Sequence, residues 1–123
     1  MSAPIIVVDY GLGNIQSVAG AVTKLGFKVA VSRERRDLER AEKLILPGVG
    51  AFGDGMRLLD GRKLTPLLNH LVLEQQKPIL GICLGAELMG RESEEFGHHL
   101  GLGWIDASII RLEGGPGLRV PHV

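Results

Sequence analysis

Pro78-Ile79-Leu80-Gly81-Ile82-Cys83-Leu84-Gly85 ends a predicted strand on a cysteine and begins a predicted helix directly after it. The apolar run at residues 78–82 is typical of a short buried strand. A helix is predicted from about Leu84 to Met89. A strand that turns at once into a helix is the building unit of α/β folds, so this stretch indicates a mostly parallel sheet.

The residues around this stretch repeat the same order of strand and helix. Apolar runs predict strands at 4–9, 27–31 and 43–46, and residues 104–112 predict a later strand that is antiparallel or at an edge. Helical spacing predicts helices over 15–25, 33–40 and 65–75, with Asn14 and Thr65 as N-caps and Gly26 as the stop. The order predicts a flavodoxin-like, doubly wound sheet with helices on both faces, forming one domain over residues 1–123.

The composition narrows the class of protein. Hydrophobic residues make up 45% and aromatic residues only 4%, which is typical of an α/β core of Val, Ile, Leu and Ala. The 14 acidic and 14 basic residues balance, which favours neither nucleic acid nor an anionic membrane as a partner. A single cysteine excludes an internal disulfide, and no apolar run suits a signal peptide. We therefore expect a soluble, cytoplasmic protein.

Cys83 has the setting of a nucleophile. Gly81-Ile82-Cys83-Leu84-Gly85 has the form G-x-C-x-G, the thiol counterpart of the G-x-S-x-G nucleophile elbow. Glycines on either side permit the sharp turn, and the following helix directs its N–H groups at the sulfur, which favours the thiolate. The N–H of Leu84 is the expected oxyanion donor. The competing interpretation, a small buried cysteine, does not explain the flanking glycines.

A second glycine-rich segment ends the predicted strand at 43–46. In Pro47-Gly48-Val49-Gly50-Ala51-Phe52, the glycines around Val49 let the backbone approach a ligand and direct its N–H groups inward. We expect a second oxyanion donor here, facing Cys83. An ordinary loop between a strand and a helix is the other interpretation of this segment.

Taken together, these motifs resemble those of the triad-type glutamine amidotransferases. The resemblance is closest to the glutaminase subunit of imidazole glycerol phosphate synthase. It rests also on Asp9-Tyr10-Gly11-Leu12-Gly13-Asn14-Ile15, on Ser93-Glu94-Glu95 and on Val120-Pro121-His122. It implies hydrolysis of glutamine to glutamate and ammonia, with no cofactor. It further implies passage of the ammonia to a (β/α)8-barrel cyclase subunit, which forms imidazole glycerol phosphate and aminoimidazole carboxamide ribotide in histidine biosynthesis.

The resemblance also implies roles for individual residues. Cys83 is the nucleophile that forms a glutamyl thioester, with Gly48, Val49 and Leu84 at the oxyanion hole. Glu87 and Glu95 stand where the family binds the substrate. The expected partner interface comprises Gly11, Gly13, Asn14 and Ser17.

The chain departs from this family in its triad. The family's base and orienting acid form a His-x-Glu pair, yet none of the four histidines here has a glutamate two positions later. We therefore expect residues 1–123 to be the N-terminal part of an amidotransferase domain, as a fragment or a truncated gene product, with negligible activity alone. The adjacent pair His98-His99 has no further ligand at suitable spacing, so no metal site is expected.

A second departure is Glu87, which stands where the family has glutamine. An ionised carboxylate accepts hydrogen bonds but cannot donate them, so substrate contacts at this position differ. Three alternative functions stay open on the sequence. One is a paralogue that amidates a sugar of a surface polysaccharide, another a non-catalytic remnant that binds the partner, and the third a cysteine hydrolase with the same elbow.

Overall fold

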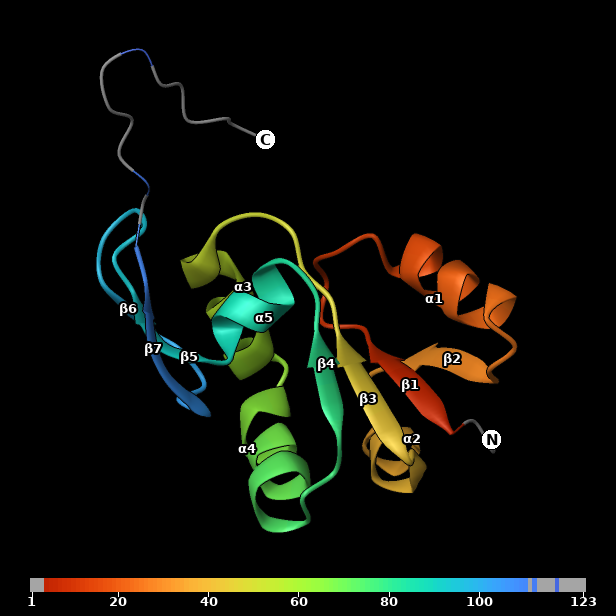
Figure 1. The fold of residues 1–123 in the computed structure, drawn as a ribbon. Coiled ribbons are helices and arrows are strands. Elements are labelled where there is room, and N and C mark those ends of the chain that lie inside the picture. The colour runs from red at the N-terminus through yellow and green to blue at the C-terminus, as the bar shows by residue number, and fades with distance from the viewer. Residues whose placement is uncertain (1–3, 111, 113–116, 118–123) are drawn as a thin grey trace.

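A four-stranded parallel sheet forms the centre of the computed structural model, which describes residues 4–110, 112 and 117 (Figure 1). Its strands are β1 (Ile5–Val8), β2 (Val29–Ser32), β3 (Lys43–Leu46) and β4 (Ile79–Gly81), in the order β2-β1-β3-β4. Their registers pair Ile6 with Ala30 and Leu44, and Leu44 with Ile79. The predicted parallel α/β sheet is confirmed, with strand bounds within two residues of those expected for 27–31 and 78–82.

Helices connect the strands and cover the sheet unequally. They are α1 (Ile15–Lys24), α2 (Arg35–Arg40), α3 (Phe52–Gly61), α4 (Leu64–Asn69), the π-helix η1 (His70–Glu74) and α5 (Leu84–Leu88). The main core lies between one face of the sheet and α2–α5, and includes Ile6, Val8, Leu44 and Leu46 from the strands. Helix α1 contributes no buried residue, although Ile15, Val18, Ala19 and Val22 are half-buried along one side of it.

The face of the sheet that lies away from this core is only partly covered. A groove of about 230 Å³ crosses it, lined by Ile5, Lys43, Leu44, Ile45, Pro78, Ile79 and Leu80. Leu80 is 58% exposed, and β4 has no strand on its outer side within the described residues. An open strand edge and an exposed apolar face both promote association, so we predict that the isolated chain aggregates.

A small second sheet, which the sequence analysis did not predict, follows α5. Its strands are β5 (Gly90–Ser93), β6 (His99–Leu100) and β7 (Ile105–Ile109), in the order β6-β5-β7. Of the two alternatives given for the 104–112 strand, the edge position is observed, whereas an antiparallel pairing is not, because β7 runs parallel to β5. Strand β6 runs antiparallel to β5 on one side of it, and β7 then runs parallel to β5 on the other side.

Two of the predicted N-caps are also not formed as expected. Asn14 precedes α1, but its side chain makes no capping bond. Helix α4 begins at Leu64 after Lys63, so Thr65 lies inside the first turn, where its hydroxyl donates to Asp60 at 2.6 Å instead. Gly26, with φ of +93°, ends α1 as predicted.

A long-range hydrogen bond helps to hold the second sheet against helix α4. The indole N–H of Trp104 donates to the side-chain oxygen of Asn69 at 2.7 Å, across 35 residues of sequence.

No helix in the described part of the chain has the length and apolar character to cross a membrane.

Candidate active site

Cys83 lies on a strained turn between β4 and α5. Its φ of 53° and ψ of −123° are unusual for any residue other than glycine, as the nucleophile-elbow interpretation requires. The side chain is exposed at the carboxyl end of β4, where ligands bind in open parallel sheets. Helix α5 has only five residues, so orientation by the turn, rather than a long helix dipole, distinguishes this thiol.

The flanking glycines are required by close backbone contacts. A Cβ on Gly85 would lie 1.8 Å from the carbonyl oxygen of Leu46, and one on Gly81 would lie 2.6 Å from Cα of Ala86. Backbone atoms at such distances cannot move aside without displacing β3 or α5. The steric argument made for the G-x-C-x-G motif therefore holds in the structure at both glycines.

We predict that Gly85→Ala destabilises the fold by at least about 3 kcal/mol, because the added methyl group overlaps the Leu46 carbonyl. Gly20→Ala is the matched control, since a Cβ there meets nothing within 4 Å and the residue lies inside α1. That control should stabilise the protein by about 0.5–1 kcal/mol. Urea unfolding of both variants measures the difference, and equal midpoints would contradict the assigned contact.

The predicted oxyanion residues lie together, but one donor is already engaged. The N–H of Leu84 donates to the carbonyl oxygen of Gly48 at 3.3 Å, and the N–H of Ile82 donates to that of Leu46 at 3.0 Å. These two bonds extend the pairing of β3 with β4 past the end of the sheet. Gly48 is buried and Val49 is 52% exposed, so the loop presents Val49 outward beside the elbow.

Behind this loop lies Tyr10, whose importance the sequence analysis missed. Its hydroxyl donates to the Pro47 carbonyl at 2.6 Å, and its own carbonyl accepts from Nε of Arg62 at 3.0 Å. The side chain is fully buried. A lone tyrosine directly after a buried strand is a signal that could have identified it, because a buried phenol needs a hydrogen-bond partner.

The four predicted interface residues follow Tyr10 in the chain. Gly11, Asn14 and Ser17 are exposed, and Gly13 is half-buried with φ of +118°. Gly11, Gly13 and Asn14 occupy the loop from β1 into α1, at the same end of the sheet as Cys83 (Figure 1), and Ser17 lies in the first turn of α1. A Cβ on Gly13 would lie 3.2 Å from the amide nitrogen of Gly48, so this loop packs directly on the Pro47–Gly50 loop.

The two predicted substrate-binding carboxylates reach the site from different elements. Glu87 lies one turn after Cys83, and its N–H donates to the Cys83 carbonyl at 3.2 Å. Glu95 follows β5 and accepts from the N–H of Phe52, the first residue of α3, at 3.4 Å. Burial, and then the nearby charge of Glu95, raise the pKa of Glu87 above its ordinary value. The fold therefore brings both carboxylates into electrostatic contact.

We predict that Glu87→Gln stabilises the protein at neutral pH but not at pH 4. Because the folded pKa is raised, ionisation of Glu87 opposes folding, and wild-type stability falls relative to the variant as pH rises above the ordinary value of 4.5. The gain should stay below about 1 kcal/mol, since the group is largely solvent-screened. Melting temperatures of wild type and variant at pH 4 and 7.5 test this, and a difference between them that is the same at both pH values would contradict it.

A hollow of about 370 Å³ adjoins Glu95. It is lined by Ala51, Gly53, Asp54, Arg57, Glu95, Phe96 and His99. It opens beside the start of α3, next to the Pro47–Gly50 loop, and holds both acidic and basic groups. The space suits a small zwitterion or a polar side chain better than an apolar ligand.

The described histidines are occupied elsewhere or lie away from the elbow. His70 pairs with Glu74, and His98 pairs with Glu92 at 2.7 Å. His99 contacts the Phe96 carbonyl at 3.2 Å. The fourth, His122, which the resemblance uses together with Val120 and Pro121, lies outside the described residues.

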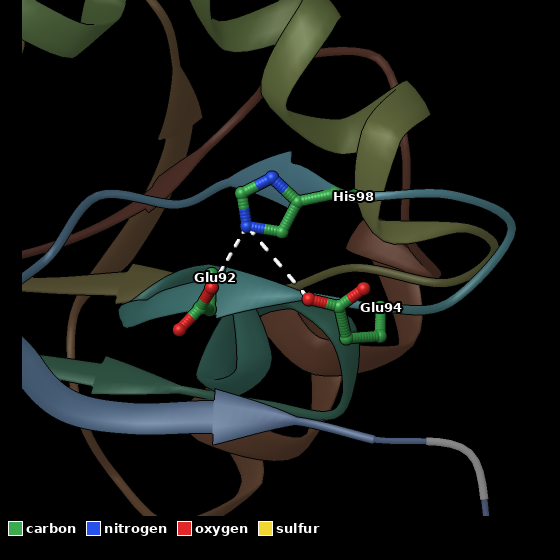
Figure 2. A group of neighbouring side chains, drawn as sticks. All are labelled: Glu92, Glu94 and His98. Atoms are coloured by element: carbon green, nitrogen blue, oxygen red, sulfur yellow. Dashed lines mark hydrogen bonds and ion pairs between the residues drawn. The ribbon is translucent and has the colours of Figure 1, made fainter.

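Glu92, Glu94 and His98 form a polar cluster on the second sheet, shown in Figure 2. Their potential ligand atoms lie within 4.8 Å of one another. Glu92 is already bonded by Arg91 at 2.8 Å and by the Ser108 hydroxyl at 3.0 Å. These bonds to His98, then Arg91 and Ser108, lower the pKa of Glu92 to about 2. Ion pairing that joins β5 to β7 and to the β5–β6 turn accounts for the cluster.

We predict that Glu92→Gln weakens the acid sensitivity of the fold. A folded pKa of about 2 against an ordinary value of 4.5 stabilises the protein above pH 4.5, and this stabilisation is lost as pH falls towards 2. The urea midpoint should therefore fall less steeply between pH 4.5 and 2 in the variant. Glu94→Gln is the control, because it keeps the bonds to Arg91 and Ser108; equal steepness in wild type and Glu92→Gln would refute the assignment.

Comparisons with known proteins agree with this geometry. The family model "Glutamine amidotransferase class-I" matches residues 6–117. The chain is 47% identical over 119 residues to "Imidazole glycerol phosphate synthase subunit HisH 2" of Pseudomonas aeruginosa, covering 97% of this chain and 58% of that protein. It is 43% identical to "Imidazole glycerol phosphate synthase subunit HisH" of Aquifex aeolicus, covering 96% and 56%. The chain thus spans little more than half the length of these relatives.

A solved structure supports the fold alone. The structure entitled "Crystal structure of glutamine amidotransferase" superposes with a TM-score of 0.73 at 22% identity, over 88% of this chain and 56% of the other. The predicted α/β fold with a mostly parallel sheet is therefore confirmed both by the strand order and by this likeness.

Proposed function

The chain belongs to the class-I glutamine amidotransferase family, and from this premise we propose that it is the N-terminal part of the glutaminase subunit of imidazole glycerol phosphate synthase. That subunit hydrolyses glutamine to glutamate and ammonia, which a cyclase subunit uses in histidine biosynthesis. The observation that supports this most is the strained, exposed Cys83 between two glycines that sterically cannot be replaced.

In the proposed reaction the thiolate of Cys83 attacks the side-chain amide carbon of glutamine. A C–S bond forms, the carbonyl π electrons move to oxygen, and the tetrahedral intermediate then expels ammonia as a proton is delivered to the leaving nitrogen. Water attacks the resulting thioester, and glutamate leaves as the thiol is restored. Both steps need an acid–base group, which the family places in a His-x-Glu pair that residues 1–123 do not contain.

The oxyanion of that intermediate requires free N–H donors beside Cys83. We assign this role to Leu84 and to the Gly48–Val49 peptide. In the described arrangement the Leu84 N–H donates to Gly48, so this bond must open before the N–H can serve an oxyanion. The loop at Pro47–Gly50 therefore has to move between the resting and the reacting form of the site.

Substrate binding is assigned to Glu87 and Glu95. Two carboxylates close enough to repel each other suit the α-ammonium group of glutamine, because a nearby cation relieves their repulsion. The adjoining hollow beside Glu95 offers room for a polar ligand. An ionised Glu87 cannot donate a hydrogen bond as the family's glutamine does. We therefore expect the affinity for glutamine to depend more strongly on pH than in relatives that have glutamine at this position.

The proposed partner is a (β/α)8-barrel cyclase that binds at Gly11, Gly13, Asn14 and Ser17. Gly11, Gly13 and Asn14 lie on the loop that packs against the Pro47–Gly50 loop, and Ser17 lies in the helix that follows, so a partner bound there would act on the site at short range. The two relatives bear the names of imidazole glycerol phosphate synthase subunits, which favours this function over the amidation of a polysaccharide sugar.

We predict that Cys83→Ala in the full-length gene product, assayed with the cyclase subunit, lowers glutamine-dependent turnover by about 10⁴-fold or more, because no nucleophile remains. Free ammonia should still support cyclase turnover in that complex, which controls for assembly. Glutamate release and covalent labelling of Cys83 by an electrophilic glutamine analogue are the measurements. Undiminished glutamate release from the variant would end the assignment of Cys83.

A further inference from the structure

Tyr10 lies in an unusually constrained position between two loops of the site. Its side chain is fully buried, and the hydroxyl donates to the Pro47 carbonyl at 2.6 Å. Burial raises its pKa above the ordinary value, so the phenol keeps its proton and remains a donor. The same oxygen lies only 2.4 Å from the place that a Cβ of Gly48 would occupy.

Gly48 is consequently held from two sides. On one side the Tyr10 hydroxyl packs against its Cα, and on the other its carbonyl accepts the N–H of Leu84 at 3.3 Å. A Cβ on Gly48 would also lie 2.9 Å from the amide nitrogen of Gly85. The Pro47–Gly50 loop therefore has little freedom while the Tyr10 bond is intact.

Tyr10 itself is anchored by Arg62, which follows α3. The guanidinium donates to the Tyr10 carbonyl at 3.0 Å, and it also lies against Gly11 of the same loop. The residues from Tyr10 to Gly13 thus form a firm backing for the Pro47–Gly50 loop. Among the described residues, no other side chain donates to the Pro47 carbonyl.

We propose that Tyr10 is a positioning residue: its hydroxyl holds the Gly48 carbonyl on the N–H of Leu84 and so keeps that N–H from serving an oxyanion. The proposal rests on the proposed function for its catalytic consequence, but the restraint itself is a property of the fold. Loss of the hydroxyl frees the loop, and the arrangement with an available Leu84 N–H becomes more populated.

Tyr10→Phe isolates this role, because phenylalanine fills the same volume and removes only the donor. One net hydrogen bond corresponds to a change of roughly fivefold to tenfold in an opening equilibrium. In the full-length protein, hydrogen exchange at the Leu84 amide should accelerate by about that factor, while the amides of β1 and β3 exchange as in the wild type. Unchanged exchange at Leu84, or equal acceleration of all amides, would overturn the proposal.

Trp104→Phe is the matched control. It removes another long-range bond from an aromatic side chain, the one to Asn69, but touches neither loop of the site. It should leave Leu84 exchange unaltered relative to β1 and β3; selective acceleration at Leu84 in this control would overturn the proposal. If Tyr10→Phe does not fold, Arg62→Gln takes its place, since it loosens the Tyr10 backbone and should accelerate the same amides, and no acceleration there counts against the proposal.

Turnover separates this role from the proposed function. Without the cyclase subunit, Tyr10→Phe should raise kcat for glutamine hydrolysis several-fold with KM unchanged, and a smaller rise should remain when the cyclase is bound. A kcat that does not rise although Leu84 exchange accelerates would overturn the catalytic consequence. A wild-type complex that does not hydrolyse glutamine would refute the proposed function instead, and exchange at Leu84 would still decide the role of Tyr10.

Discussion

The contact between Gly85 and the carbonyl of Leu46 governs the geometry of the candidate site. A Cβ at Gly85 would lie 1.8 Å from that oxygen, so the start of α5 rests directly on the end of β3. The same carbonyl accepts the N–H of Ile82 at 3.0 Å, just before the cysteine. Because Ile82 and Gly85 both lie against this one carbonyl, the chain between them has to turn sharply, and Cys83 takes the positive φ that the turn requires.

This close packing also explains why the resting site is closed. Extending the β3–β4 pairing beyond the sheet satisfies backbone groups that would otherwise be buried without partners. The last bond of that extension engages the Leu84 N–H, the group that the proposed chemistry needs free. The Leu84 N–H can therefore either stabilise the resting form or serve the proposed chemistry, but it cannot do both at once. The competition can be altered from outside, because the 10–13 loop packs on the same segment.

The elbow could be predicted from sequence because its cause is local. Two glycines around a cysteine, after an apolar run, leave few backbone solutions, and the parallel strands followed from their apolar runs in the same way. The second sheet could not be predicted in this way, because β6 has only two residues and its pairing with β5 depends on a turn at Phe96 and Gly97. The direction of β7 depends on its pairing with β5 across the intervening strand β6, which no local pattern encodes. Likewise the bond of Tyr10 to Pro47 spans 37 residues.

The two faces of the sheet differ in how far the described residues cover them. The side of the sheet that carries Cys83 is supported by the core under α2–α5 and by the contacts of Tyr10 and Gly13 with the Pro47–Gly50 loop. The opposite face carries α1 and a groove, and the outer edge of β4 has no strand beside it within the described residues. Because Cys83 follows β4 directly, any strand that pairs with this edge brings one of its ends beside the thiol. If Cys83 acts as proposed, covering the exposed Leu80 and bringing a base to the thiol are thus demands made at the same edge of the sheet, which links the stability of the fold to the proposed chemistry.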